Sequence, residues 1–355
     1  MEFPLYVDEM ARSAIDRLRM LPEGNTVDFA FFTDVHNCTN YADRALYAIG
    51  EINKRYKIDF VCIGGDYLCN NQWTDREEAR RQHREMAGII SKYQNEVPII
   101  ALRGNHDDNH MGGAGATLLT EEIHDLIMKP MERFCKTAEK KTLYGYYDVP
   151  EKKFRMIYLD VFDPEYIKDG SNVYYKGGRD TVIGNKQLKW LCEKALILPE
   201  KDWLVAVFAH AFPIPTPFYK SERFFGGDAL VEILSAFKEG DTYTSSGKRG
   251  DLSYDVTCDF SAQGKGRLIG YFCGHYHCDW KWTVSELNVV AHLSMASDNF
   301  RVGICDDGTK HLKTRGSGEE SAFSIFRVYP DKGEVYCIRC GAGPDYCFKF
   351  SNRIP

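Results

Sequence analysis

The stretch VPIIALRGNHD at residues 97–107 decides the fold, because an apolar run typical of a buried strand stops there at a polar cluster. Two earlier stretches have the same form: VDFAFFTD at residues 27–34 and IDFVCIGGD at residues 58–66. Residues 41–56, with an apolar stripe at helical spacing, and residues 75–93, which are rich in charge, are expected to form helices between these strands. The alternation predicts an α/β fold. In a parallel sheet, the three polar clusters would share the edge where ligands collect.

The second half of the chain is less regular, but it also reads as strands and helices. Strands are expected at residues 154–160 and 203–210, with a helix at 185–198 between them and another helix at 224–238. Four further apolar runs are expected to supply a second sheet, at residues 267–273, 284–292, 322–328 and 334–340. Because no linker or internal repeat interrupts the pattern, we predict one domain of two stacked sheets flanked by helices.

That single domain is expected to span residues 1–355, with a core at about 25–340 onto which an N-terminal helix and the C-terminal strands pack. Residues 239–266 are rich in Gly, Ser, Thr, Asp and Lys and predict a long loop. The loop directly precedes the strand that ends at His275 and His277, so we expect it to line or cover the functional rim and to affect substrate choice. A solvated insertion is the alternative.

The composition is that of an ordinary globular chain, with 44% hydrophobic and 27% charged residues. The net charge of -6 speaks against a protein that holds nucleic acid mainly through a basic surface. No apolar run is long enough to span a membrane, and the first residues lack the apolar core of a secretory signal. The twelve cysteines are scattered, so we expect a soluble, reduced, cytoplasmic protein. Oxidised pairs in a secreted enzyme are the alternative.

Residues able to bind metals follow each of five apolar runs. They are Asp34 and His36, Asp66, the run Asn105-His106-Asp107, His210, and the pair His275 and His277. Asp, His and Asn ligands without thiolate suit Mn, Fe or Zn ions. The set is too large for one open catalytic ion and fits two ions that share a carboxylate, an arrangement suited to in-line phosphoryl displacement. Bound metal would also attract an anionic substrate to an acidic protein.

The ordered set of motifs resembles the calcineurin-like metallophosphoesterase superfamily over residues 25–295. The resemblance implies a four-layer fold in which two stacked sheets lie between helices, with a dinuclear metal site at one edge. Asp34, His36 and His277 would hold one ion, Asn105, His210 and His275 the other, and Asp66 would bridge them. A bridging hydroxide would attack phosphorus in line. His106 would then protonate the leaving oxygen or stabilise equatorial charge, and Asp107 would orient His106.

The sequence differs from two well-known classes of the superfamily, which makes membership of either class less expected. Asp66 is followed by Tyr67-Leu68-Cys69-Asn70 and not by the acidic-basic-glycine run of Ser/Thr protein phosphatases, which also carry Glu at the position of Asp107. Purple acid phosphatases place a metal-binding Tyr at the position of Cys69. The remaining resemblance is to the cyclic-nucleotide-phosphodiesterase-like branch and to bacterial or phage branches. The expected enzyme is therefore a metal-dependent phosphoric ester hydrolase acting on a small phosphorylated substrate, monoester or diester.

Several residues keep alternative interpretations. Arg103 is a candidate for contacting a substrate phosphate, with a salt bridge to a carboxylate as the alternative. His110 lies four residues after His106, and it either lines the pocket or, like the remaining histidines His83, His124, His292 and His311, serves surface or packing roles. The pair Cys337 and Cys340 is expected to pack in the core, since residues three apart in a strand face opposite sides. At the level of function, the rivals are a nuclease of the same fold and a scaffold that has lost its metals.

Overall fold

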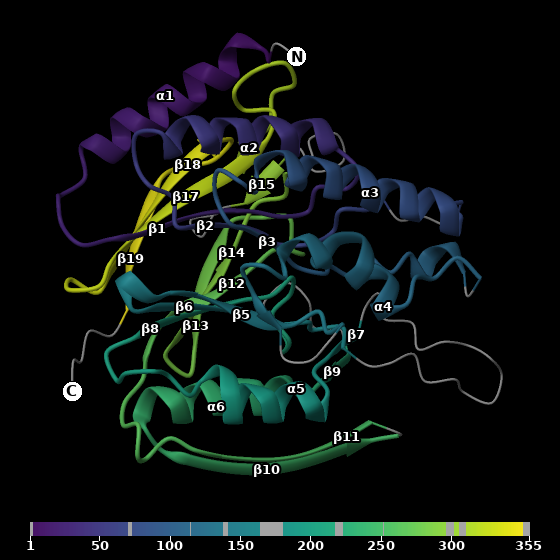
Figure 1. Ribbon diagram of the computed structural model, residues 1–355, viewed down its shortest axis with the longest axis vertical. Coiled ribbons are helices and arrows are strands. Elements are labelled where there is room, and N and C mark those ends of the chain that lie inside the picture. Colours follow the sequence, from purple (N-terminus) through teal and green to yellow (C-terminus); the bar gives the residue numbers. More distant parts are fainter. Residues whose placement is uncertain are drawn as a thin grey trace.

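Two large β-sheets pack face to face in the computed structural model (Figure 1). The structure describes residues 3–69, 73–113, 115–137, 141–163, 180–216, 223–250, 252–295, 302–304 and 310–350. The first sheet has the order β19-β18-β17-β1-β2-β3 and the second β13-β14-β12-β8-β6-β5-β4. The predicted α/β fold of two stacked sheets flanked by helices is confirmed.

In the first sheet, three parallel strands are extended on one side by an antiparallel set. The parallel strands are β1 (Val27–Phe32), β2 (Phe60–Ile63) and β3 (Ile99–Ala101), and the antiparallel strands are β17 (Ala322–Tyr329), β18 (Glu334–Gly341) and β19 (Tyr346–Lys349). The expectation that residues 322–328 and 334–340 belong to the second sheet is wrong. β17 pairs with β1 instead, because Arg327 lies opposite Asp28 and forms a buried ion pair with it, Nη2 to Oδ2 2.6 Å.

The second sheet is built around parallel strands that run from the middle of the chain. Its central strands are β6 (Phe154–Tyr158), β8 (Leu204–Phe208), β12 (Arg267–Cys273) and β14 (Leu287–Ala291), which are parallel to one another. Antiparallel strands close both sides: β13 (Trp280–Val284) on one, β5 (Gly145–Val149) and β4 (Lys136–Thr137) on the other. The carboxyl ends of β8 and β12 thus lie on the same side of this sheet.

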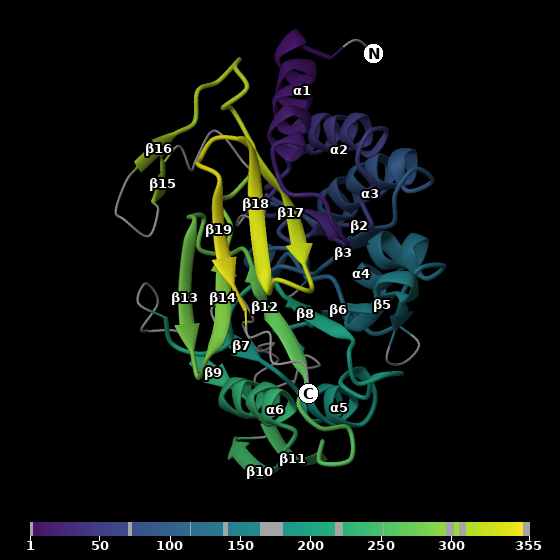
Figure 2. The same cartoon turned by 90° about the vertical axis from the view of Figure 1, so that its left-hand side faces the viewer.

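Helices cover the outer face of each sheet (Figures 1 and 2). The first sheet is covered by helices α1 (Leu5–Arg19), α2 (Thr39–Asn53) and α3 (Arg76–Tyr93). The second sheet is covered by α5 (Asn185–Trp190) and α6 (Gly227–Glu239), and α5 continues as a π-helical turn at Leu191–Ala195. The remaining described elements are small. They are a short helix, α4 (Thr120–Ile123), the strand pair β7 (Asp180–Val182) with β9 (Arg223–Phe225), the strand pair β15 (Val302–Ile304) with β16 (Lys310–Leu312), and short 3₁₀ and π turns. Across the described ranges, no helix is both long and apolar enough to cross a bilayer.

The expected loop at residues 239–266 is instead mainly a β-hairpin, and that prediction is wrong. Strands β10 (Thr242–Arg249) and β11 (Leu252–Asp259) pair antiparallel and pack on the far side of α5 and α6 (Figure 1), as an additional outer layer. One face of β11 is buried through Leu252, Val256 and Cys258, while the alternate residues are exposed. The hairpin therefore covers helices, and its packing does not support the expected role at the functional rim.

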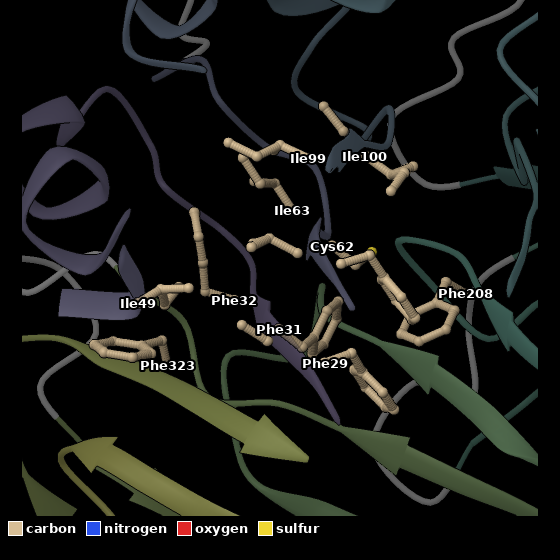
Figure 3. Packing of buried hydrophobic residues seen from close by; sticks show 14 of the residues in the cluster. Phe29, Phe31, Phe32, Ile49, Cys62, Ile63, Ile99, Ile100, Phe208 and Phe323 are labelled. Atoms are coloured by element: carbon tan, nitrogen blue, oxygen red, sulfur yellow. The ribbon is translucent and has the colours of Figure 1, made fainter. Parts of the chain in front are cut away.

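Aromatic rings pack against one another between the two sheets, among them Phe29, Phe31 and Phe208 (Figure 3). The ring of Phe29 on β1 meets Phe208 and Phe272 of the second sheet edge-on, each with centroids 5.4 Å apart, and stacks on Phe60 and Phe326 within its own sheet at 5.1 Å. All five rings are fully buried. Burying phenylalanine contributes about 1.5–3 kcal/mol per side chain. This core fixes one sheet against the other, and with it the strand ends that carry the polar clusters.

Candidate metal centre

Five strand ends from both sheets meet at one rim, and the seven predicted metal ligands lie there. Asp34 and His36 follow β1, Asp66 follows β2, Asn105 follows β3, His210 follows β8, and His275 and His277 follow β12. Because β1, β2 and β3 are parallel, as are β8 and β12, the carboxyl ends of each group point the same way. The rim is thus built by two sheets that the aromatic core holds face to face.

The first group of ligand atoms comes from Asp34, His36, Asp66 and His277. One atom from each of these four side chains lies within 4.8 Å of all the others, a spacing suited to holding a metal ion. Nε2 of His277 lies 3.0 Å from Oδ1 of Asp34 and 3.1 Å from Nε2 of His36. Carboxylate and imidazole donors at such separations are the ligands that first-row transition metals bind.

A second group lies beside the first and shares Asp66 with it. Nε2 of His210 lies 3.1 Å from Oδ2 of Asp66 and 3.1 Å from Oδ1 of Asn105, while Nδ1 of His275 lies 2.8 Å from the same Asn105 oxygen. Oδ2 of Asp66 is also 3.9 Å from Nε2 of His36. This oxygen is buried and accepts no well-aligned hydrogen bond from the described residues, while the imidazole of His210 lies at ion-pair distance from it. A buried carboxylate oxygen of that kind fits a cation better than a protein donor.

The loops that carry the ligands have unusual backbone conformations. Five of the seven ligands have positive φ: Asp34 (57°), His36 (47°), Asp66 (56°), His275 (70°) and His277 (54°). Such conformations are uncommon for residues other than glycine and cluster at functional sites, where the surroundings hold them in place.

Two neighbouring glycines explain how the loops approach so closely. A Cβ at Gly104 would overlap Oδ1 of Asp66, and one at Gly274 would overlap Oγ1 of Thr33. Glycine is therefore required at both positions.

Backbone groups orient several of the ligands. The N–H of His106 donates to Oδ1 of Asp66 at 2.8 Å, and the N–H of His275 donates to both oxygens of Asp34 at 3.1–3.2 Å. Nδ1 of His210 lies 2.7 Å from the carbonyl oxygen of Gly64, so it carries the hydrogen and donates it. The Nε2 lone pair of His210 thereby becomes available to a metal, the usual arrangement behind metal-binding histidines.

Electrostatics in the metal-free chain depend on the two buried carboxylates. Burial alone would raise the pKa of Asp34, but the imidazoles of His277 and His210 bring it below its usual range. The pKa of Asp66 is likewise held well below its usual range by His210 and His106, against the effect of burial. Burial would lower the pKa of His210, yet Asp66 and Asp34 raise it to about 10. For His36 burial prevails over the same carboxylates and lowers the pKa to about 4. Two ionised carboxylates thus face one another, a charge arrangement that favours bound cations.

Asp107 does not orient His106, so that expectation is wrong. Its carboxylate oxygens accept the backbone N–H groups of Gly104 at 2.6 Å, Tyr67 at 2.7 Å and Asp66 at 2.9 Å. Asp107 therefore ties the loop after β3 to the loop after β2 and shapes the turn that carries Asp66. Burial, together with the charge of Asp66, raises the pKa of Asp107 to about 7.

His106 lies at the edge of the ligand group. Its Nε2 is 3.9 Å from Oδ2 of Asp66, and its ring meets that of His36 edge-on with centroids 5.0 Å apart. With a 26% exposed side chain, His106 is more accessible than the surrounding ligands His36 (8%) and His210 (0%). Its position thus differs from theirs in its access to solvent.

Arg103 forms a salt bridge to a carboxylate, which was the alternative to its predicted contact with a substrate phosphate. Its side chain is 3% exposed, its Nε lies 3.5 Å from Oδ1 of Asp160, and its Nη2 donates to the carbonyl oxygen of Phe162. Asp160 and Phe162 follow β6 in the second sheet, whereas Arg103 follows β3 in the first. Arg103 thus joins the two sheets, and this geometry does not support the contact with a substrate phosphate.

The other histidines described are held in place by packing and hydrogen bonds. His83, His124 and His292 are buried, and Nε2 of His83 donates to the carbonyl oxygen of Asp107 at 2.9 Å. Nδ1 of His110 lies 2.8 Å from Oδ1 of Asp108. The side chain of His311 lies outside the described residues. Cys337 and Cys340 are fully buried core residues, as predicted.

Sequence reasoning missed two residues that meet the centre from the C-terminal part of the chain. Oγ of Ser294 donates to the carbonyl oxygen of Asp34 at 3.0 Å, and the buried Lys313 donates from Nζ to the carbonyl oxygen of Ser294. No motif surrounds either residue. The one available signal is that Ser294 follows an apolar strand, β14, as the predicted ligands follow theirs.

The chain is similar to one protein family in sequence and to several solved structures. The sequence model named calcineurin-like phosphoesterase matches residues 27–279. Similar solved structures include the Plasmodium protein GAP50, which is described as the anchor in the inner membrane complex. It is 13% identical in sequence, the alignment covers 92% of this chain and 89% of that chain, and the TM-score is 0.46. Another is a Streptococcus pneumoniae protein described as a predicted phosphoesterase, with 10% identity, coverage of 92% and 99%, and a TM-score of 0.34.

A third is the protein TT1561 of Thermus thermophilus, with 10% identity, coverage of 67% and 96%, and a TM-score of 0.32. No curated protein sequence matches the chain. The family match covers strands β1 to β12, all seven ligand positions and more than half of the chain. The chain belongs to the calcineurin-like phosphoesterase family.

Proposed function

We propose that this protein is a metal-dependent hydrolase of phosphoric esters that works with two cations in the candidate metal centre. The observation that carries the proposal is Oδ2 of Asp66, a buried carboxylate oxygen with no well-aligned hydrogen bond from the described residues and with ligands from both groups around it. Family membership supports the class of reaction.

The donor set fits two transition-metal ions such as Mn, Fe or Zn. Asp34, His36 and His277 would hold one ion, Asn105, His210 and His275 the other, and Asp66 would contact both. When bound, such ions supply Lewis-acid polarisation of phosphoryl oxygens and activate water at neutral pH. The chain contributes the fixed positions of the ligands, through the backbone donors to Asp34 and Asp66 and through the carbonyl of Gly64 behind His210.

His106 is proposed as the proton donor to the leaving oxygen. Its Nε2 faces the ligand group, whereas its Nδ1 is buried and has no hydrogen bond among the described residues. Of the histidine side chains at the rim, His106 is more exposed than His36, His210 and His277. A substrate bound at the rim would thus meet the Nε2 hydrogen of His106 from the solvent side. General acid assistance of this type contributes typically ~10²–10⁴ in rate.

A small phosphate ester is the proposed substrate class. The net charge of -6 leaves little general attraction for long polyanions, so charge at the metal centre would provide most of the attraction for phosphate. Phosphomonoesters and phosphodiesters both fit this reasoning.

Metal content and hydrolysis, measured on the same preparations, test the proposal. Wild type loaded with Mn²⁺ should hold two ions and hydrolyse bis-nitrophenyl or mono-nitrophenyl phosphate. Asp66→Asn should lose metal and activity while its circular dichroism spectrum is unchanged. Asp59→Asn is the matched control, because Asp59 is also a buried carboxylate but precedes β2 where Asp66 follows it. Wild-type turnover of Asp66→Asn at saturating Mn²⁺ would refute the proposal.

A further inference from the structure

A buried ion pair lies directly beside the loop that carries His275 and His277. Nη2 of Arg339 donates to Oδ1 of Asp279, and the two side chains are only 1% and 8% exposed. Arg339 belongs to β18 in the first sheet, while Asp279 lies between His277 and β13 of the second. The pair therefore connects the two sheets two residues beyond a proposed metal ligand.

Hydrogen bonds also link the pair to Leu293 and Ser294, the segment that contacts Asp34. Nη1 of Arg339 lies 2.9 Å from Nε2 of His292, whose Nδ1 donates to the carbonyl oxygen of Leu293 at 2.8 Å. The N–H of Leu293 donates to Oδ1 of Asp279 at 3.1 Å. The next residue, Ser294, donates from Oγ to the carbonyl oxygen of Asp34 at 3.0 Å. Arg339 thus contacts both the loop after β12 and the segment that supports Asp34.

The loop after β12 needs such support because its conformation is unfavourable on its own. His275 and His277 both have positive φ, a backbone conformation that is unfavourable for residues other than glycine and persists only where the surroundings hold it. The preceding Gly274 packs so closely on Thr33 and Asp34 that no Cβ fits there. A loop held only by its own residues would relax and move the two imidazoles away from Asp34 and Asn105.

We propose that Arg339 is a positioning residue that sets the affinity of the centre for its cations by holding Asp279 and, through it, the loop of His275 and His277. The inference rests on the proposed metal centre. It concerns a residue beyond the span of 27–279 that the family model matches. Interactions behind metal ligands typically change metal affinity 10–100-fold when they are removed.

The choice of variants must separate this role from general stability. Arg339→Met alone leaves the buried carboxylate of Asp279 without its cationic partner, which is strongly destabilising in itself. The double variant Arg339→Met/Asp279→Asn removes both charges together. Arg339→Lys keeps the charge but loses the planar fork that reaches Asp279 and His292 together. It serves as the second variant if the double variant does not fold.

The matched control is a second buried ion pair between Arg327 of β17 and Asp28 of β1, 8% and 3% exposed. Asp28 is near the start of β1, whereas Asp34 follows its end, so this pair lies far from the centre along the same strand. Arg327→Met/Asp28→Asn should lower the melting temperature of the metal-free protein while the affinity for Mn²⁺ stays the same.

Isothermal titration calorimetry with Mn²⁺, together with melting of the metal-free proteins, tests the inference. Arg339→Met/Asp279→Asn should raise the dissociation constant for Mn²⁺ 10–100-fold, and Arg339→Lys should raise it less. Unchanged Mn²⁺ affinity in both Arg339 variants, or an equal loss in the Arg327→Met/Asp28→Asn control, would overturn the inference while the metal centre stands. Wild type that binds no Mn²⁺, or binds it equally well as Asp66→Asn, would instead overturn the proposed function, and the inference with it.

Discussion

His36 and His277 bring their Nε2 atoms within 3.1 Å of each other, although one follows a strand of the first sheet and the other a strand of the second. Asp34, 3.0 Å from His277, adds a carboxylate to this contact between the sheets. A cation held by these side chains would cross-link the two sheets at the rim. Metal binding should therefore stabilise the whole fold and not only the site.

The first prediction follows from that cross-link. Adding Mn²⁺ to metal-free protein should raise the melting temperature by several degrees, because a ligand present at 100 times its dissociation constant stabilises the folded state by about 2.7 kcal/mol. Chelation with EDTA should reverse the shift, and His277→Asn should reduce it. Differential scanning calorimetry measures all three. Identical melting with Mn²⁺ and with EDTA would contradict the prediction.

The second prediction separates the proton donor from the metal ligands. His106→Asn should keep both ions and lose ~10²–10⁴ in rate on alkyl or ribosyl phosphate esters, whose leaving oxygen needs a proton. It should lose much less on a nitrophenyl ester, whose leaving group departs without one. His275→Asn, which removes a ligand contact to Asn105, should lose metal and fail on both esters.

Metal content must be measured on the preparations used for the rates. If His106→Asn loses its ions, the residue is a ligand. If it slows both esters equally with the ions retained, it stabilises charge on the phosphoryl group and does not donate a proton.

The sequence predicted the strand ends of the rim well for a physical reason. Strands buried on both faces are short continuous apolar runs, and a polar residue stops such a run where it reaches the edge of the sheet. Asp34, Asp66 and His210 all occupy that position. Asp34 and Asp66 converge once β1 and β2 are parallel, and His210 joins them because the second sheet packs against the first. Apolar runs that stop at polar residues therefore predict both the fold and the meeting of the ligands at one rim.

Other features could not be read because several structures satisfy the same pattern. An apolar run such as 322–328 fits either sheet, and only the pairing of Arg327 with Asp28 assigns it to the first. In β10 the inward-facing positions include Ser245 and Gly247 in place of large apolar residues, so the strand carries no apolar alternation. The partners of Asp107 are backbone N–H groups, and spacing along the sequence does not reveal which of them a carboxylate will accept.

The third prediction concerns Arg103, which joins the sheets through Asp160 and Phe162. Arg103→Met should lower the free energy of unfolding by about 3–5 kcal/mol, because it leaves a buried carboxylate without its partner. At temperatures where the variant is folded, KM for nitrophenyl phosphate should stay near the wild-type value. Urea unfolding and steady-state kinetics measure the two effects. A raised KM with unchanged stability would restore the role of phosphate ligand.

The fourth prediction is a pH dependence of stability that comes from His83. Burial lowers the pKa of His83 to about 4, and its Nε2 donates to the carbonyl oxygen of Asp107. In the unfolded chain its pKa is about 6.5, so between these values the unfolded state binds the extra proton. The stability contribution is therefore complete above pH 6.5 and is lost as the pH falls toward 4, with a slope of up to about 1.4 kcal/mol per pH unit. His83→Gln keeps a donor for Asp107 without titrating, so urea unfolding of this variant should show a shallower loss between pH 6.5 and 4. Parallel curves for the two proteins would mean that His83 does not titrate on unfolding.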